Sequence, residues 1–161
     1  MSVTAILQKV PLFGQLSPTE LERVAEITRE RSYPRNSVIL FEDDPGDALY
    51  VVAKGQVKVV LIGEDGREVI LSVLGEGDFF GEMSLIDGEP RSADARAYAG
   101  PLTVLALDQA TVREVLAMDP QAALELLHLL CRLIANRLRE IDEKVVGWRI
   151  MSGERNESVS A

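Results

Sequence analysis

Hydrophobic and polar positions divide the chain into three parts. Apolar residues recur at helical spacing in residues 1–32, form short β-branched runs in residues 33–107, and return to helical spacing in residues 108–146. Turns rich in Gly, Asp and Pro separate the β-branched runs, and no segment long enough for a crossover helix lies between them. The pattern predicts a mainly β domain with flanking helices: a double-stranded β-helix (jelly-roll) barrel with an N-terminal helical cap and a long C-terminal helix.

The strands are expected where Val, Ile and Leu cluster, and the turns where glycine follows polar residues. The expected strands are 38–41, 49–52, 57–61, 69–73 and 102–105, and the expected turns are 44–46, 54–56, 63–66 and 75–77. A barrel built from such strands offers a ligand cavity between its sheets.

The N-terminal part contains a clear helix start. Ser17 is followed by a proline at the first helical position and by Glu20, which together form a capping box. Leu21 and Val24 then fall on one face of the helix. Because no residue of chemical interest stands out in residues 1–32, we expect this part to be a structural cap on the barrel.

The C-terminal part predicts a short helix over 108–118, a break at Asp119-Pro120, and a long helix from about Gln121 to beyond Val146. Apolar residues in the long helix alternate spacings of three and four, which is typical of a coiled-coil seam. An alternative is that this stripe packs only on its own barrel, but such stripes tend to be wider and less regular. The pattern therefore favours a homodimer joined through this helix. The seam residues are Leu124, Leu127, Cys131, Ile134, Leu138, Ile141, Val145 and Trp148.

Composition limits the class of protein. A chain of 161 residues with 47% hydrophobic residues is long enough for one domain that buries about 70% of its unfolded surface. No run approaches the ~20 apolar residues of a membrane span, and the N-terminus lacks the pattern of a signal peptide. The single cysteine, Cys131, excludes an internal disulfide framework. These features predict a cytoplasmic protein with no membrane partner.

The net charge of −9 argues against nucleic acid as a direct partner. Phosphate-backbone binding requires clustered Lys and Arg, and the chain has no basic stripe or arm.

An enzyme also fits poorly. A metal site on such a barrel needs several histidines, yet the only one, His128, lies beside the apolar stripe of the long helix. We therefore expect no catalytic residues and no metal.

The candidate site is the loop of residues 79–93, which has the composition of an anion cradle. Gly81 allows the backbone to approach a ligand, and the amides of the following helical turn favour an anion. Arg91 and Ser92 supply further donors suited to phosphate oxygens. Glu82 is useful beside an anion only if the ligand also carries a hydroxyl donor, as a ribose does. A phosphate and a sugar hydroxyl together indicate a nucleotide.

The same loop resembles the phosphate-binding cassette of cyclic-nucleotide-binding domains. The resemblance begins with Phe80-Gly81-Glu82-Met83-Ser84-Leu85, includes Pro90-Arg91-Ser92-Ala93, and extends over roughly residues 6–146. It implies a domain over 1–146 with N-terminal helices (1–32), a barrel (33–107) carrying the cassette (79–93), and C-terminal helices (108–146). A short tail would follow over 147–161.

The resemblance also implies individual roles. Glu82 would accept the ribose 2′-hydroxyl, and Arg91 and Ser92 would bind the cyclic phosphate. The remaining expected ligand contacts are Gly81 and the amides near Met83, Ser84 and Ala93, with Val59 and Leu71 packing the base. On the long helix, matching by position places Ile141 and Asp142 where the family's catabolite activators contact adenine through hydroxyls. Because neither residue has a hydroxyl, base selectivity stays open, with cAMP slightly favoured over cGMP.

The expected output is less definite than the expected ligand. In catabolite activators a helix-turn-helix domain follows the long helix, whereas only residues 147–161 remain here. The chain is therefore expected to be a dimeric cyclic-nucleotide sensor that signals through an unknown protein partner. The alternatives are a sensor fragment of a catabolite-activator-like transcription regulator, or a structural dimer with a vestigial pocket.

Overall fold

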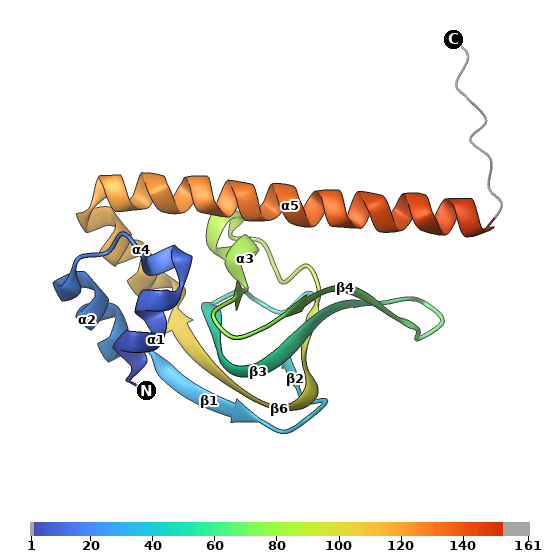
Figure 1. Cartoon of the computed structure of the whole chain (residues 1–161), viewed down its shortest axis with the longest axis horizontal. Coiled ribbons are helices and arrows are strands. Elements are labelled where there is room, and N and C mark those ends of the chain that lie inside the picture. The colour runs from blue at the N-terminus through green and yellow to red at the C-terminus, as the bar shows by residue number, and fades with distance from the viewer. Residues whose placement is uncertain (1, 153–161) are drawn as a thin grey trace, which may run out of the picture.

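The computed structural model describes residues 2–152, which form a curved β-sheet with helices gathered at one end and one long helix across it (Figure 1). The elements in chain order are α1 (Val3–Lys9), η1 (Pro11–Phe13), α2 (Pro18–Ile27), β1 (Arg29–Tyr33), β2 (Val38–Leu40), β3 (Ala48–Ile62), β4 (Glu68–Leu74), β5 (Phe79–Phe80), α3 (Glu82–Asp87), β6 (Asp94–Asp108), α4 (Gln109–Met118) and α5 (Pro120–Ser152).

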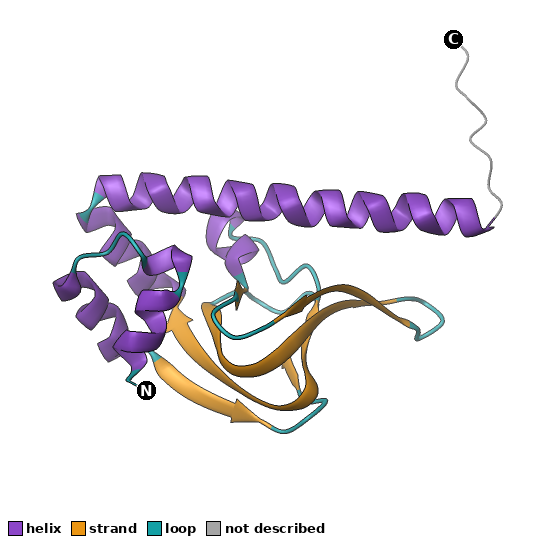
Figure 2. Ribbon diagram, in the orientation of Figure 1, coloured by secondary structure: helices purple, strands orange, loops and turns teal. Residues whose placement is uncertain are grey.

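The strands pair antiparallel in the order β1-β6-β3-β4, with β2 also paired to β6 and β5 paired to β3. Figure 2 shows the strands curling over one another, with the helices kept to the outside. The predicted fold class, an antiparallel jelly-roll-type sheet flanked by helices, is confirmed.

One expected turn is wrong. Residues 54–56 lie inside the continuous strand β3, so the two strands expected at 49–52 and 57–61 are one strand of 15 residues. Gly55 has φ +92°, and the pairing of β3 with β6 shifts register on both sides of Lys54. A Cβ at position 55 would lie 2.5 Å from the Pro101 carbonyl oxygen. The glycine therefore marks a β-bulge, which bends the strand without ending it.

Strand β1 was not predicted, because residues 1–32 were expected to be helical. It pairs with β6 from Arg29↔Ala106 to Tyr33↔Leu102. Its sequence, RERSY, has no apolar alternation because its side chains are mainly exposed at the edge of the sheet. Strand β6 also begins earlier than expected, at Asp94, directly after the loop of residues 79–93.

Two apolar clusters hold these elements together. The first packs α1, α2, α4 and the start of α5 on the sheet, and its fully buried members include Leu7, Leu49 and Leu105. The second lies within the curved sheet, where the ring of Tyr50 stacks on that of Phe80 with centroids 5.2 Å apart. Because Phe80 directly precedes Gly81, this stacking fixes the start of the candidate loop.

The helix starts follow the expected caps. The Ser17 side chain accepts from the Glu20 amide while the Glu20 side chain accepts from the Ser17 amide, so the capping box is present. Asp108 accepts from the first amides of α4. The expected domain limit at residue 146 falls inside α5, which runs to Ser152, and residues 153–161 of the expected tail lie outside the described residues.

Helix α5 divides its apolar residues between two faces. Leu126 and Leu130 are buried in the first cluster. The residues of the expected seam do not join them: Leu124, Leu127, Cys131, Leu138, Val145 and Trp148 are exposed, and Ile134 and Ile141 are half-buried. Within residues 2–152, no helix is both long and apolar enough to cross a membrane.

Candidate functional site

A cavity of about 280 Å³ opens between the loop of residues 79–93, the sheet and α5. Nearly all of the residues predicted for the site line this cavity. They are Gly81, Glu82, Met83, Ser84, Arg91, Ser92 and Ala93 from the loop, Val59 and Leu71 from the sheet, and Ile141 from α5. Asp142 is exposed and is not among the lining residues, so the structure does not bring it to the site.

Arg91 is the buried cation of the cavity, with 4% of its surface exposed. Its Nη1 donates to the Gly81 carbonyl oxygen at 3.0 Å and its Nη2 to the Ala48 carbonyl oxygen at 2.7 Å. Nε is buried and makes no hydrogen bond to the described residues. Burial lowers the pKa of Arg91, and the nearby Tyr50 and Asp47 oppose that change. A buried, incompletely satisfied guanidinium in a cavity is suited to an anion.

Gly81 makes this placement of Arg91 possible. Its φ of +85° lies in the left-handed region, which glycine adopts without a steric cost. A Cβ at this position would lie 2.8 Å from Arg91 Nη1 and 3.0 Å from the Ala48 carbonyl oxygen. The glycine is therefore required both by the backbone turn into α3 and by the space that the guanidinium occupies.

Glu82 is 1% exposed, and its carboxylate forms an ion pair with Arg137 of α5. Arg137 also donates from Nη2 to the Phe79 carbonyl oxygen at 3.2 Å. Only Oε1 of Glu82 is used, and Oε2 makes no hydrogen bond to the described residues. One carboxylate oxygen is therefore left for a donor inside the cavity.

Arg137 was missed by the sequence reasoning. The available signal was its spacing: it lies four residues before Ile141, so both side chains fall on one face of the helix. Four further lining residues were also missed, namely Leu40, Ser72, Phe80 and Ala95.

Helix α3 carries Met83 and Ser84 of the loop. Gly81 precedes it without a side-chain cap, so its first amides have no capping partner from Gly81. Arg113 of α4 donates to the Leu85 carbonyl oxygen at 2.5 Å and ties the helix to the scaffold. Ser84 is buried, whereas Ser92 is exposed with its hydroxyl 3.5 Å from the Met83 sulfur.

The opposite wall of the cavity is mainly apolar. It is formed by Leu40, Val59 and Leu71 from the sheet and by Ile141 from α5. Lys144 Nζ donates to the carbonyl oxygens of Ile70 and Leu71, at 3.2 Å and 2.6 Å, and so holds α5 against β4. A flat apolar group fits this wall, while charged groups of a ligand fit the wall that contains Arg91.

Among residues 2–152, no group of three or more His, Cys, Asp and Glu side chains is placed to hold a metal ion.

Comparison with known proteins identifies the family. The family model described as the cyclic nucleotide-binding domain matches residues 30–119, which is more than half of the chain. The chain therefore belongs to the cyclic nucleotide-binding domain family, as the loop of residues 79–93 predicted.

Individual relatives support the same assignment. The chain is 39% identical over 132 residues to the cyclic AMP receptor protein of Thermus thermophilus, covering 82% of this chain and 59% of the relative. The crystal structure of Thermus thermophilus catabolite activator protein matches with 37% identity and a TM-score of 0.68, covering 84% of this chain and 61% of that one. The N-terminal domain of a transcriptional regulator from Streptomyces coelicolor matches with 35% identity and a TM-score of 0.65, covering 86% and 95%. The chain spans about three fifths of the length of the first curated relatives that it matches.

Proposed function

We propose that this protein binds a cyclic nucleotide in the cavity beside Arg91 and acts in the cytoplasm as a dimeric regulatory sensor. The observation that carries the proposal is the buried guanidinium of Arg91, whose Nε has no partner among the described residues while the rest of the group is held by Gly81 and Ala48. The cyclic phosphate would supply the missing acceptor. The resulting charge-assisted hydrogen bond would form in a site already shielded from water.

Glu82 supports a ribose rather than a bare phosphate as the ligand. Its Oε1 pairs with Arg137, and its other oxygen, Oε2, can accept a hydrogen bond from the ribose 2′-hydroxyl. An anionic ligand without this hydroxyl would meet an unfavourable carboxylate. Ser92 and the amides near Met83, Ser84 and Ala93 would complete the phosphate shell.

The base would lie against Val59, Leu71 and Ile141. This wall presents no carboxylate to the ring N–H and exocyclic amine that distinguish guanine, and Asp142, which could have served, is exposed and does not line the cavity. The relative from Thermus thermophilus is named a cyclic AMP receptor protein. Both observations favour cAMP over cGMP.

A second copy of this chain is the partner proposed for α5. Its seam residues alternate spacings of three and four, and all of them except the half-buried Ile134 and Ile141 are exposed, with Leu138 58% and Trp148 61% exposed. Exposed apolar stripes of this regularity are stabilised by a matching helix. The response to ligand would then reach a downstream protein through this dimer, since the acidic surface gives nucleic acid no basic stripe to contact.

A regulator that works by binding fits better than an enzyme, because the relatives described above are named as a receptor, an activator and a transcriptional regulator. The alternative that this chain is the sensor part of a transcription regulator is supported by its match to one regulator's N-terminal domain.

Titration calorimetry with cAMP, cGMP and AMP tests the proposal. We expect saturable binding of cAMP, weaker binding of cGMP, and none of AMP at the same concentrations, because AMP carries an extra charge and an open phosphate. Absence of heat with either cyclic nucleotide would refute the assignment and leave the vestigial-pocket alternative.

A further inference from the structure

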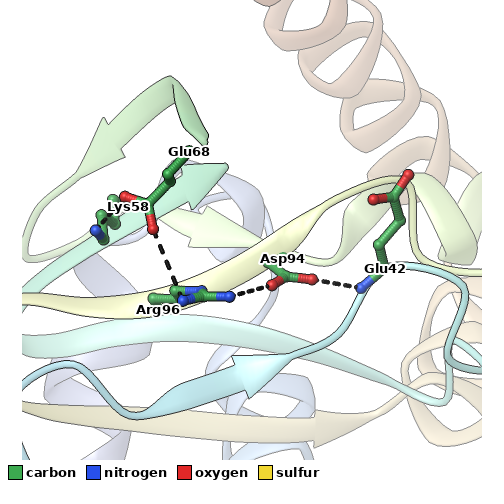
Figure 3. Close-up of polar contacts among 5 residues, drawn as sticks. All are labelled: Glu42, Lys58, Glu68, Asp94 and Arg96. Atoms are coloured by element: carbon green, nitrogen blue, oxygen red, sulfur yellow. Dashed lines mark hydrogen bonds and ion pairs between the residues drawn. The ribbon is translucent and has the colours of Figure 1, made fainter. Parts of the chain in front are cut away.

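A row of charged side chains lies behind the cavity, on the other face of the sheet. Figure 3 shows Lys58, Glu68, Arg96 and Asp94 following one another toward the main chain at Glu42. Lys58 and Arg96 each pair with Glu68, the second at 3.7 Å, and Arg96 also pairs with Asp94 at 2.8 Å. These side chains come from three neighbouring strands, β3, β4 and β6.

The row and the cavity share the same strands but not the same face. Ala93 and Ala95 line the cavity, and Asp94 lies between them in the chain. Val59 also lines the cavity, while its neighbour Lys58 belongs to the row. None of the four side chains of the row is among the residues that line the cavity, so we expect the row to act on a ligand through the backbone.

Asp94 fastens the segment that carries Arg91. It is 6% exposed, and its Oδ1 accepts from the Glu42 amide at 2.8 Å. Two further bonds join the same segments: the Asp43 amide donates to the Arg91 carbonyl oxygen at 2.8 Å, and the Arg91 amide donates to the Asp44 carbonyl oxygen at 2.9 Å. Residues 42–44 and 91–94 therefore form one clamped unit, which we call the Arg91 clamp.

Glu68, which pairs with both Lys58 and Arg96, places the row on β4, the strand that contributes to the opposite wall of the cavity. Glu68 is at the start of this strand, and Leu71 and Ser72 of the same strand line the cavity. Arg96 joins Glu68 of β4 to Asp94 of the clamp, since it contacts Glu68 through Nη1 and Asp94 through Nη2. Its Nε is buried without a partner among the described residues. The two ion pairs therefore offset the cost of removing the Arg96 guanidinium from water.

We propose that Asp94 is a positioning residue for Arg91, and that the row Lys58–Glu68–Arg96–Asp94 couples the Arg91 clamp to β4. Removing the Glu68 charge releases the Nη1 side of Arg96 from β4, so the guanidinium that pairs with Asp94 is no longer fixed to this strand and the Arg91 clamp loosens. The effect on ligand affinity rests on the proposed cyclic-nucleotide function, whereas the coupling itself does not.

Amide hydrogen exchange without nucleotide tests the coupling. In Asp94→Asn and in Glu68→Gln, exchange in residues 42–44 and 91–94 is expected to be about fivefold or more faster, the lower end of ordinary coupling effects. Residues 104–107 in the centre of β6 serve as the internal reference and are expected to keep their rate. A merely structural role would raise exchange in both regions together, and unchanged exchange in the clamp of Glu68→Gln would overturn the proposal.

Calorimetry with cAMP then tests positioning. Asp94→Asn is expected to raise the Kd about tenfold, equivalent to loss of one charge-assisted hydrogen bond, and Glu68→Gln to raise it less. The matched control is Asp65→Asn, because Asp65 pairs with Arg67 at 3.4 Å on the same hairpin but both side chains are largely exposed. Equal affinity of Asp94→Asn and wild type would overturn the positioning role. If Asp94→Asn does not fold, the Kd of Glu68→Gln for cAMP decides the positioning role. If the wild type binds no cyclic nucleotide, the proposed function fails, but the hydrogen-exchange result still decides whether the row couples the clamp to β4.

Discussion

Glu82 of α3 and Arg137 of α5 form an ion pair between residues 55 positions apart in the chain. The pair joins the loop that holds the candidate ligand contacts to the helix that carries the candidate dimer seam. The proposed ligand contact at Glu82 and the position of α5 would therefore depend on the same carboxylate.

Arg137→Ala is expected to destabilise the protein by about 3 kcal/mol, because it leaves the Glu82 carboxylate buried and unpaired. The free energy of unfolding from urea denaturation measures the change. The double variant Glu82→Gln/Arg137→Ala should recover part of the loss, since it removes the uncompensated charge as well. A loss of stability in the double variant equal to the sum of the losses in Arg137→Ala and in Glu82→Gln alone would contradict the pairing.

Arg91→Ala is expected to weaken cyclic-nucleotide binding at least tenfold, which corresponds to the ~1.5–3 kcal/mol of a hydrogen bond to a charged group. Calorimetry with cAMP provides the measurement. Arg67→Ala is the control, because Arg67 is an exposed arginine whose ion pair lies on the surface. An unchanged Kd in Arg91→Ala would remove Arg91 from the site.

Gly81→Ala separates backbone strain from crowding of the Arg91 guanidinium. Alanine at φ +85° costs about 1–2 kcal/mol in stability, and its Cβ would also displace Arg91 Nη1. The matched control is Gly66→Ala, since Gly66 has φ +77° and no atom within 4 Å of an added Cβ. Both variants should lose stability, but only Gly81→Ala should lose cAMP affinity; equal affinities would show that Arg91 placement does not depend on Gly81.

Leu138→Glu is expected to convert a dimer into a monomer by placing a charge in the seam. Arg139→Glu introduces the same residue one position along, outside the predicted seam, and should leave the dimer intact. Light scattering at micromolar concentration distinguishes the two masses. A monomeric wild type would contradict the proposed dimer before any variant is needed.

Cys131 gives an independent test of the seam register, because its thiol is free and exposed. In a parallel pair the two Cys131 residues face each other, and copper-catalysed oxidation by O₂ should join them as a disulfide. The product would run as a dimer on a non-reducing gel. Cys131→Ser/Arg139→Cys moves the thiol off the seam and should remain monomeric on the gel; efficient cross-linking there would argue for another register.

Acid titration tests the Asp94 ion pair. Burial raises the pKa of Asp94, but the hydrogen bond from Arg96, the Glu42 amide and the Arg96 charge together bring it below its ordinary value. The stabilisation is therefore complete above the unfolded pKa of about 3.9 and is lost as the pH falls through the lower folded pKa. The stability difference between wild type and Asp94→Asn should be constant from pH 5 to 7 and shrink below about pH 4. A difference that widens on acidification would contradict this sign.

Most of the residues that line the candidate cavity could be predicted because they are close together in the sequence. Gly81, Glu82, Arg91 and Ser92 lie within one loop, so their spacing alone indicated a cradle for a phosphate and a sugar. Arg137 comes from another element, and its contact with Glu82 depends on how α5 lies over α3, which a spacing pattern does not specify. Asp142 illustrates the same limit, because a shift of one residue on a helix turns a side chain about 100° away from the cavity.

The fold showed a similar division. Strands with apolar alternation were predicted, whereas β1 was missed because an exposed edge strand needs no apolar face. Gly55 was read as a turn because a glycine with positive φ has the same sequence signature in a turn and in a bulge. Only the pairing partner, β6, distinguishes the two.

Because α5 is long, a small change in its tilt at Arg137 or Lys144 produces a larger displacement at the end of the helix. The helix continues from Arg137 to Ser152, about 22 Å at 1.5 Å per residue, and Figure 1 shows this half extending over the β3–β4 side of the molecule. A tilt of about 5° with Arg137 as the pivot would displace the far end by about 2 Å, which is enough to unseat interlocked side chains. The apolar residues at that end, Val145, Val146, Trp148, Ile150 and Met151, are exposed, so a small change at the candidate site would be converted into a larger displacement of an exposed apolar surface.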